Sequence, residues 1–154
     1  MTKLSRRTLM KGVGVAATLS MIGSAARAED KIKVGFIFLG PIGDYGWTWA
    51  HNKGREAIDA ELGDKVETLY VENVAEDASA IPVIRDLAQQ GCKLIFTTSY
   101  GYMDQTLQVA SEFPDVKFEH CAGFKRADNV ATYNSKFHEG RAVLGTISGK
   151  MSKS

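Results

Sequence analysis

The sequence predicts an α/β fold, in which a parallel sheet carries helices on both faces. Apolar runs of strand length alternate along the chain with longer segments of helical periodicity. This alternation is typical of right-handed β-α-β crossovers, which place helices on the two faces of a parallel sheet. Glycine or proline separates most of the segments, as expected where strands and helices end.

The first strand and helix are the clearest elements. Residues 32–39 are nearly all apolar, which predicts a strand buried on both faces, and a Gly-Pro pair ends it. A glycine-rich loop follows at 40–46. Residues 47–62 then place apolar side chains near helical spacing, and Gly63 ends this predicted helix.

The same reasoning assigns the rest of the chain. Strands are predicted at 66–71, 93–98, 116–121 and 130–133, and helices at 80–90, 104–113 and 139–151. Ligands of open parallel sheets bind beyond the carboxyl ends of the strands. The candidate binding surface therefore comprises the loops that follow the strands, at 40–46, 72–77, 99–103, 122–129 and 134–138.

Residues 1–28 predict a signal peptide of the twin-arginine type. Arg6 and Arg7 precede an apolar stretch at 13–26, Ala26-Arg27-Ala28 offers small residues for cleavage, and no acidic residue precedes Glu29. The stretch is shorter than the roughly 20 residues of a membrane-spanning helix, and glycines and serines interrupt it. We therefore expect a mature chain that begins near Glu29 and lies outside the cytoplasm.

The mature chain, residues 29–154, is long enough for one domain. Five of the 19 basic residues lie in the leader, which leaves 14 basic residues against 18 acidic ones. A mildly acidic domain without a basic cluster argues against nucleic-acid binding.

Two cysteines remain in the mature chain, and we expect both to be free. Cys92 begins one predicted strand and Cys121 ends the next. In a parallel sheet these ends lie at opposite edges, roughly 15 Å apart at about 3.3 Å per residue. A disulfide needs Cα atoms within about 7 Å of each other, so two buried thiols are predicted.

The first loop carries the densest group of candidate ligand contacts. Asp44 can accept hydrogen bonds, and three aromatic side chains, Tyr45, Trp47 and Trp49, offer flat faces for a planar ring. Stacking of a base on an aromatic ring contributes roughly 1–3 kcal/mol. The alternative is that Asp44 caps the following helix and the tryptophans pack in the core.

The loop after the third strand adds hydroxyl and aromatic groups. Ser99, Tyr100, Tyr102 and Asp104 lie together at the end of a predicted buried strand. They are candidates for contacting a ligand at the carboxyl edge of the sheet. Asp104 also opens a predicted helix, so the alternative role of N-cap stays open.

Signatures of catalysis and metal binding are absent from the sequence. The three histidines are scattered without metal-ligand spacing. Neither a phosphate-binding loop, a Gly-x-Gly-x-x-Gly motif nor a nucleophile-elbow motif occurs. We therefore expect no metal, no cofactor and no enzyme activity. A small exported flavodoxin-like or hydrolase-like enzyme is the alternative.

Several segments, in order along the mature chain, resemble the basic membrane protein family, also described as purine-nucleoside-receptor-like. These segments are 34–37, 43–47, 94–104, 113–118 and 129–133. Members of that family are periplasmic solute-binding components of ABC importers. The resemblance implies a type I periplasmic-binding-protein fold, in which two α/β lobes close around a purine base or nucleoside.

The resemblance also implies roles for individual residues. Asp44 matches an aspartate that bonds the ligand, and Trp47 replaces a phenylalanine that stacks on the base. Thr48 stands where many members have asparagine. Asp104 matches an aspartate near the ligand, after the turn that Tyr100 and Tyr102 flank.

Other positions depart from the family pattern. Many members have Asp-Gly after the fourth strand, where this chain has His-Cys-Ala-Gly at 120–123. The Trp-Thr-Trp sequence at 47–49 looks closer to a subgroup associated with purine bases such as adenine. The departures leave the choice between base and nucleoside open.

The family resemblance further implies a second lobe of similar size, which is missing from this chain. We therefore expect the sequence to be a fragment, the amino-terminal lobe of a longer protein, and to bind purines weakly or not at all by itself. The expected partner is an ABC permease in the inner membrane. A ligand-sensing module of the same fold is an alternative to transport.

Overall fold

The structure, a computed structural model, describes residues 31–153, so the predicted signal peptide at 1–28 lies outside the described residues. The chain forms a five-stranded sheet in the order β2-β1-β3-β4-β5, and every pair of neighbouring strands is parallel. The strands are β1 (Ile32–Ile37), β2 (Val66–Val71), β3 (Leu94–Thr97), β4 (Lys117–Cys121) and β5 (Val130–Tyr133). The prediction of a parallel α/β sheet is confirmed.

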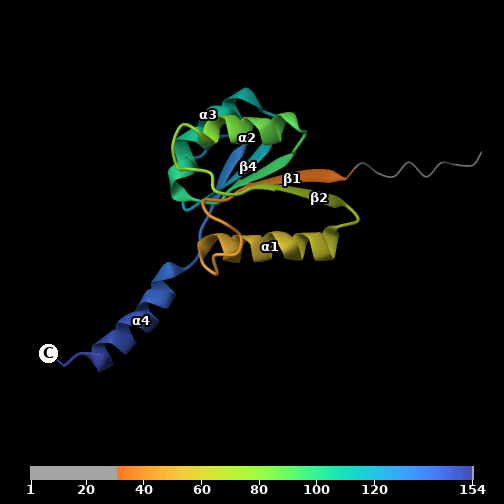
Figure 1. Cartoon of the computed structure of the whole chain (residues 1–154). Helices are drawn as coiled ribbons and strands as arrows, with labels where there is room; N and C mark the ends of the chain where they lie inside the picture. The colour runs from red at the N-terminus through yellow and green to blue at the C-terminus, as the bar shows by residue number, and fades with distance from the viewer. Residues whose placement is uncertain (1–30, 154) are drawn as a thin grey trace, which may run out of the picture.

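Helices cover both faces of this sheet, as predicted (Figure 1). On one face lies α1 (Trp47–Leu62), and on the other lie α2 (Ala80–Gln89) and α3 (Met103–Glu112). A short 3₁₀ turn, η2 (Tyr100–Tyr102), precedes α3 and was not predicted. All predicted helix and strand bounds agree with the structure to within two residues.

The last helix, α4 (Phe137–Met151), stands apart from the sheet (Figure 1). None of its residues is buried. Its larger apolar side chains, Val143, Leu144, Ile147 and Met151, are all exposed. No helix within residues 31–153, α4 included, is long and apolar enough to cross a membrane.

Two apolar cores hold the sheet between its helices. The larger core joins the sheet to α2 and α3 through fully buried side chains such as Ile84, Ile95 and Val109. The smaller core lies on the α1 face, where the rings of Phe36 and Phe96 stack at 4.8 Å. Burial of one such side chain stabilises the fold by about 1.5–3 kcal/mol.

Polar side chains anchor α1 to the sheet. Its two buried residues are Thr48 and Asn52. The Thr48 hydroxyl accepts the backbone N–H of Gly40 at 3.0 Å. The guanidinium of Arg55 donates to Thr68 on β2 and lies 4.5 Å above the ring of Tyr70. The Thr48 contact fixes the first turn of α1, where Trp47 lies, and the Arg55 contacts hold the middle of the helix against β2.

The two cysteines are free and buried, which confirms the prediction made from strand geometry. Cys92 precedes β3 and Cys121 ends β4. Burial raises the pKa of both thiols, so both are held in the neutral form.

Candidate ligand-binding site

The indole of Trp47 ties the first loop to the end of β3. Its Nε1–H donates to the backbone carbonyl of Thr98 at 2.7 Å. Thr98 is fully buried, whereas Trp47 keeps 36% of its surface exposed. The hydrogen bond therefore fixes the orientation of the ring and leaves part of it open at the carboxyl edge of the sheet.

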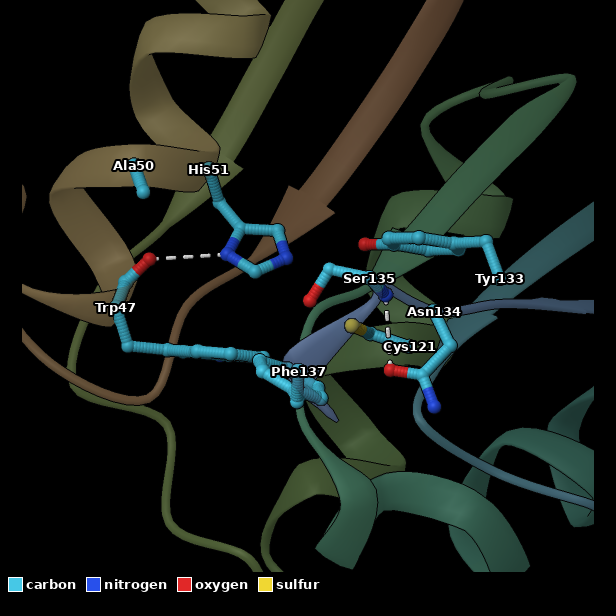
Figure 2. A pocket seen from close by; sticks show the side chains of 8 residues that line it. All are labelled: Trp47, Ala50, His51, Cys121, Tyr133, Asn134, Ser135 and Phe137. Carbon is cyan, nitrogen blue, oxygen red and sulfur yellow. Dashed lines mark hydrogen bonds between the residues drawn. The ribbon is translucent and has the colours of Figure 1, made fainter. Parts of the chain in front are cut away.

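An aromatic cavity of about 390 Å³ lies beside this indole (Figure 2). The Trp47 ring lies 5.8 Å from that of Phe137 and 4.8 Å from that of His51. His51 in turn faces Tyr133, with ring centroids 6.2 Å apart. The lining residues are Trp47, Ala50, His51, Cys121, Tyr133, Asn134, Ser135 and Phe137.

Of the residues proposed from the sequence, Trp47 alone lines this cavity. The others come from the helical turn after Trp47, from the ends of β4 and β5, and from the segment that leads into α4. The sequence contained some indication of these other lining residues. His51 is four residues from Trp47 on one helix face, and residues 134–138 had been placed at the carboxyl edge.

Asp44 binds backbone N–H groups at the start of α1, although the N-cap residue of this helix is Gly46. Its Oδ1 accepts the backbone N–H groups of Gly46 at 2.8 Å and of Trp49 at 3.0 Å. The hydrogen bond from Gly46 is the main reason that the pKa of the Asp44 carboxyl lies below its usual range. Both bonds fall on Oδ1, which leaves Oδ2 as the oxygen that can turn to a ligand.

The predicted aromatic cluster of the first loop divides into two parts. Tyr45 and Trp49 pair with each other at 5.9 Å, and the ammonium of Lys53 lies 5.7 Å from the Trp49 ring. Tyr45 is 83% exposed and has a left-handed backbone with φ of 54°. Neither aromatic lines the cavity beside Trp47.

The loop after β3 is held by the loop after β2. Ser99 donates its hydroxyl hydrogen to Glu76 at 2.5 Å, and the Gly101 N–H donates to the same Glu76 oxygen at 2.8 Å. Tyr100, between them, is 55% exposed. Tyr102 is fully buried and donates its hydroxyl to the carbonyl of Val74, so its side chain faces the core.

Asp104 lies in the first turn of α3 and is exposed. Its carboxylate pairs with the ammonium of Lys125 at 2.6 Å, which joins the loops after β3 and β4. The structure places the helix cap at Tyr102, with no side-chain cap bond, so the alternative of Asp104 as the N-cap is wrong.

A buried polar chain lies beneath the ends of β3 and β4. His120 Nδ1 is 2.9 Å from the hydroxyl of Thr97, which also accepts from Thr106. His120 Nε2 is buried and has no hydrogen-bond partner. Desolvation lowers the pKa of His120, so the ring is held neutral. Within residues 31–153, no three His, Cys, Asp or Glu side chains converge as metal ligands.

The sequence of the chain matches a known family over the whole described region. Residues 31–154 match the family model of PnrA-like ABC transporter substrate-binding proteins. The chain belongs to this family. The family consists of transport proteins rather than enzymes; its members bind small molecules, work with a permease and are exported.

Two curated relatives extend the comparison. The chain is 57% identical over 141 residues to a purine-binding protein of Brucella abortus (strain 2308), covering 90% of this chain and 40% of that protein. It is 33% identical over 131 residues to a putative ABC transporter glucose-binding protein of Haloferax volcanii, covering 85% of this chain and 33% of that one. The chain thus spans two fifths or less of these relatives.

Among solved structures, an ABC transporter solute-binding protein from Aeropyrum pernix K1 has the same fold. It matches with a TM-score of 0.65 and 24% identity, over 74% of this chain and 31% of that chain. The parallel sheet is therefore that of a periplasmic-binding-protein lobe, as the sequence predicted.

Proposed function

We propose that this chain is the amino-terminal lobe of an exported solute-binding protein that delivers a purine base or nucleoside to an ABC permease. Residues 1–28 act as a twin-arginine signal peptide, and residues 29–154 form the lobe in the periplasm. One observation carries the proposal of a planar ligand: the exposed, hydrogen-bonded indole of Trp47 beside an aromatic cavity.

The cavity suits a flat ring in size and in chemistry. Its volume of about 390 Å³ lies within the range of about 300–1,000 Å³ found for small-molecule sites. Trp47 is already held by Thr98, so stacking costs little side-chain freedom. Base-on-aromatic stacking contributes roughly 1–3 kcal/mol.

The polar groups of the rim supply hydrogen bonds to the ring. The N–H of Gly46 lowers the pKa of the Asp44 carboxyl further below neutral pH, and its Oδ2 can accept a ring or exocyclic N–H. Tyr100 and Asp104 are exposed at the same edge. We assign the buried Thr48 and Tyr102 supporting roles, since their hydroxyls bond to backbone groups of the fold.

A sugar is the second candidate ligand, because the Haloferax relative is named for glucose. Aromatic rings and carboxylates also suit a sugar ring. The purine is favoured because the relative named for purine binding is 57% identical, against 33% for the other.

The test compares adenine, a purine nucleoside and glucose by calorimetry and by tryptophan fluorescence. Each is titrated into this chain and into a two-lobed protein completed with the remaining sequence of the Brucella relative. We expect the two-lobed form to bind adenine or the nucleoside more tightly than this chain, because a second lobe covers the ligand.

Two matched variants test the stacking residue. We expect Trp47→Ala to abolish the fluorescence change and to lower affinity at least tenfold, whereas Trp49→Ala keeps both. An affinity unchanged by Trp47→Ala would remove this residue from the site. Tighter binding of glucose than of any purine would replace the proposed ligand.

A further inference from the structure

The carboxylate of Glu76 connects two loops of the binding edge that the sequence places far apart. Glu76 lies between β2 and α2, and its Oε1 accepts the hydroxyl of Ser99 at 2.5 Å and the N–H of Gly101 at 2.8 Å. One oxygen thus holds both ends of the turn that displays Tyr100.

The turn is shaped to receive this side chain. A Cβ atom built on Gly101 would lie 2.6 Å from both Cβ and Cδ of Glu76. No real side chain tolerates such a contact, so Glu76 lies flat against the glycine. Glycine at this position is required by the approach of Glu76, since its own φ is not in the left-handed region.

A second tie holds the same pair of loops from the core side. Tyr102 donates its hydroxyl to the carbonyl of Val74, and the N–H of Val74 donates to the carbonyl of Phe38 at 3.0 Å. The loop after β2 is therefore anchored to the end of β1. From this anchored position Glu76 reaches the exposed part of the turn, where Tyr100 is 55% exposed.

We infer that Glu76 is a positioning residue for the ligand site: it holds the Ser99–Tyr102 turn so that Tyr100 stands at the rim of the site. This inference rests on the proposed function, because it concerns the same edge of the sheet. Glu76 acts through the turn and does not itself contact the ligand.

The test uses three variants. Glu76→Ala removes the acceptor, and Glu76→Gln keeps an oxygen that can accept both hydrogen bonds. Glu72→Ala removes another carboxylate from the same loop and serves as the control. Two ligand-free readouts are the hydrogen-exchange rate of the Gly101 amide and the backbone relaxation of Tyr100, both by NMR on this chain. The third readout is the adenine affinity of the two-lobed protein.

We expect Glu76→Ala to speed exchange at Gly101 at least tenfold, to increase the mobility of Tyr100 and to weaken adenine binding about tenfold. Glu76→Gln and Glu72→Ala should remain near wild type in all three readouts. This pattern separates positioning from direct contact, because a residue that touches the ligand through its charge would not be rescued by glutamine.

Three outcomes would overturn the inference. Gly101 exchange unaffected by Glu76→Ala would show that the carboxylate does not hold the turn. Faster exchange with unchanged adenine affinity would show that the turn does not serve the site. Loss of affinity in Glu76→Gln with slow Gly101 exchange would make Glu76 a direct ligand contact. If the wild-type two-lobed protein does not bind purines, the proposed function is refuted instead. The two ligand-free readouts then still decide whether Glu76 holds the turn.

Discussion

Replacing Trp47 by phenylalanine isolates the hydrogen bond that fixes the stacking residue. The variant keeps a flat ring but loses the Nε1–H that donates to the Thr98 carbonyl at 2.7 Å. Thr98 is fully buried, so its carbonyl loses a partner that water cannot readily replace. A buried polar group left unpaired costs about 1–3 kcal/mol. The smaller phenyl ring also loses apolar contact, which adds to this cost, because a Trp47 side chain that is 36% exposed has most of its surface buried.

We therefore expect Trp47→Phe to lower the free energy of unfolding by at least about 2 kcal/mol, the middle of the range for the unpaired carbonyl alone. Urea unfolding followed by far-UV circular dichroism measures this loss from the midpoint and slope. Trp49→Phe is the control, because the Trp49 indole N–H makes no hydrogen bond within residues 31–153. Equal losses in the two variants, or a loss below about 0.5 kcal/mol in Trp47→Phe, would refute the reasoning.

Three further predictions concern the fold around the site. Burial lowers the pKa of His120, so the unfolded chain takes up a proton below about pH 6.5 that the native chain does not. The free energy of unfolding should therefore fall as pH drops from about 6.5 toward the lowered folded pKa, by at most about 1.4 kcal/mol per pH unit. Over the same pH range, the urea midpoint of His120→Asn should fall less than that of the wild type. Gly123→Ala places a Cβ 2.0 Å from the His120 ring and should lower the free energy of unfolding in urea by about 1–3 kcal/mol. Its control, Gly54→Ala, has open space around the new Cβ and should stabilise α1 by about 0.5–1 kcal/mol. Ile84→Ala, at a fully buried position, should cost about 2–5 kcal/mol by the same assay, and a similar loss in the exposed Ile147→Ala would contradict the core described above.

The sequence predicted the elements well, because local signals and tertiary packing agree in this chain. Residues 32–39 are apolar except for Lys33, and the structure buries most of this segment between two helical layers. Gly91 ends α2 in the left-handed region, with φ of 90°, as a C-terminal glycine does. The 3₁₀ turn before α3 was missed because three residues carry no periodicity.

The binding edge could be predicted only in part. Trp47 was identified from its loop, but its partner Phe137 lies 90 residues away and no local pattern joins them. Ser99 was proposed as a ligand contact, and the structure brings it to Glu76 from another loop. Helix capping and ligand binding require the same carboxylate at Asp44, so sequence alone could not separate the two roles.

The parallel order of the strands has a consequence for how such proteins diversify. Each loop at the carboxyl edge of the sheet follows a different strand. The register of the strands is set by apolar side chains that lie away from that edge. A change in one connection can alter what is recognised without disturbing the pairing of the other four strands. Relatives named for a purine and for a sugar can therefore share one scaffold.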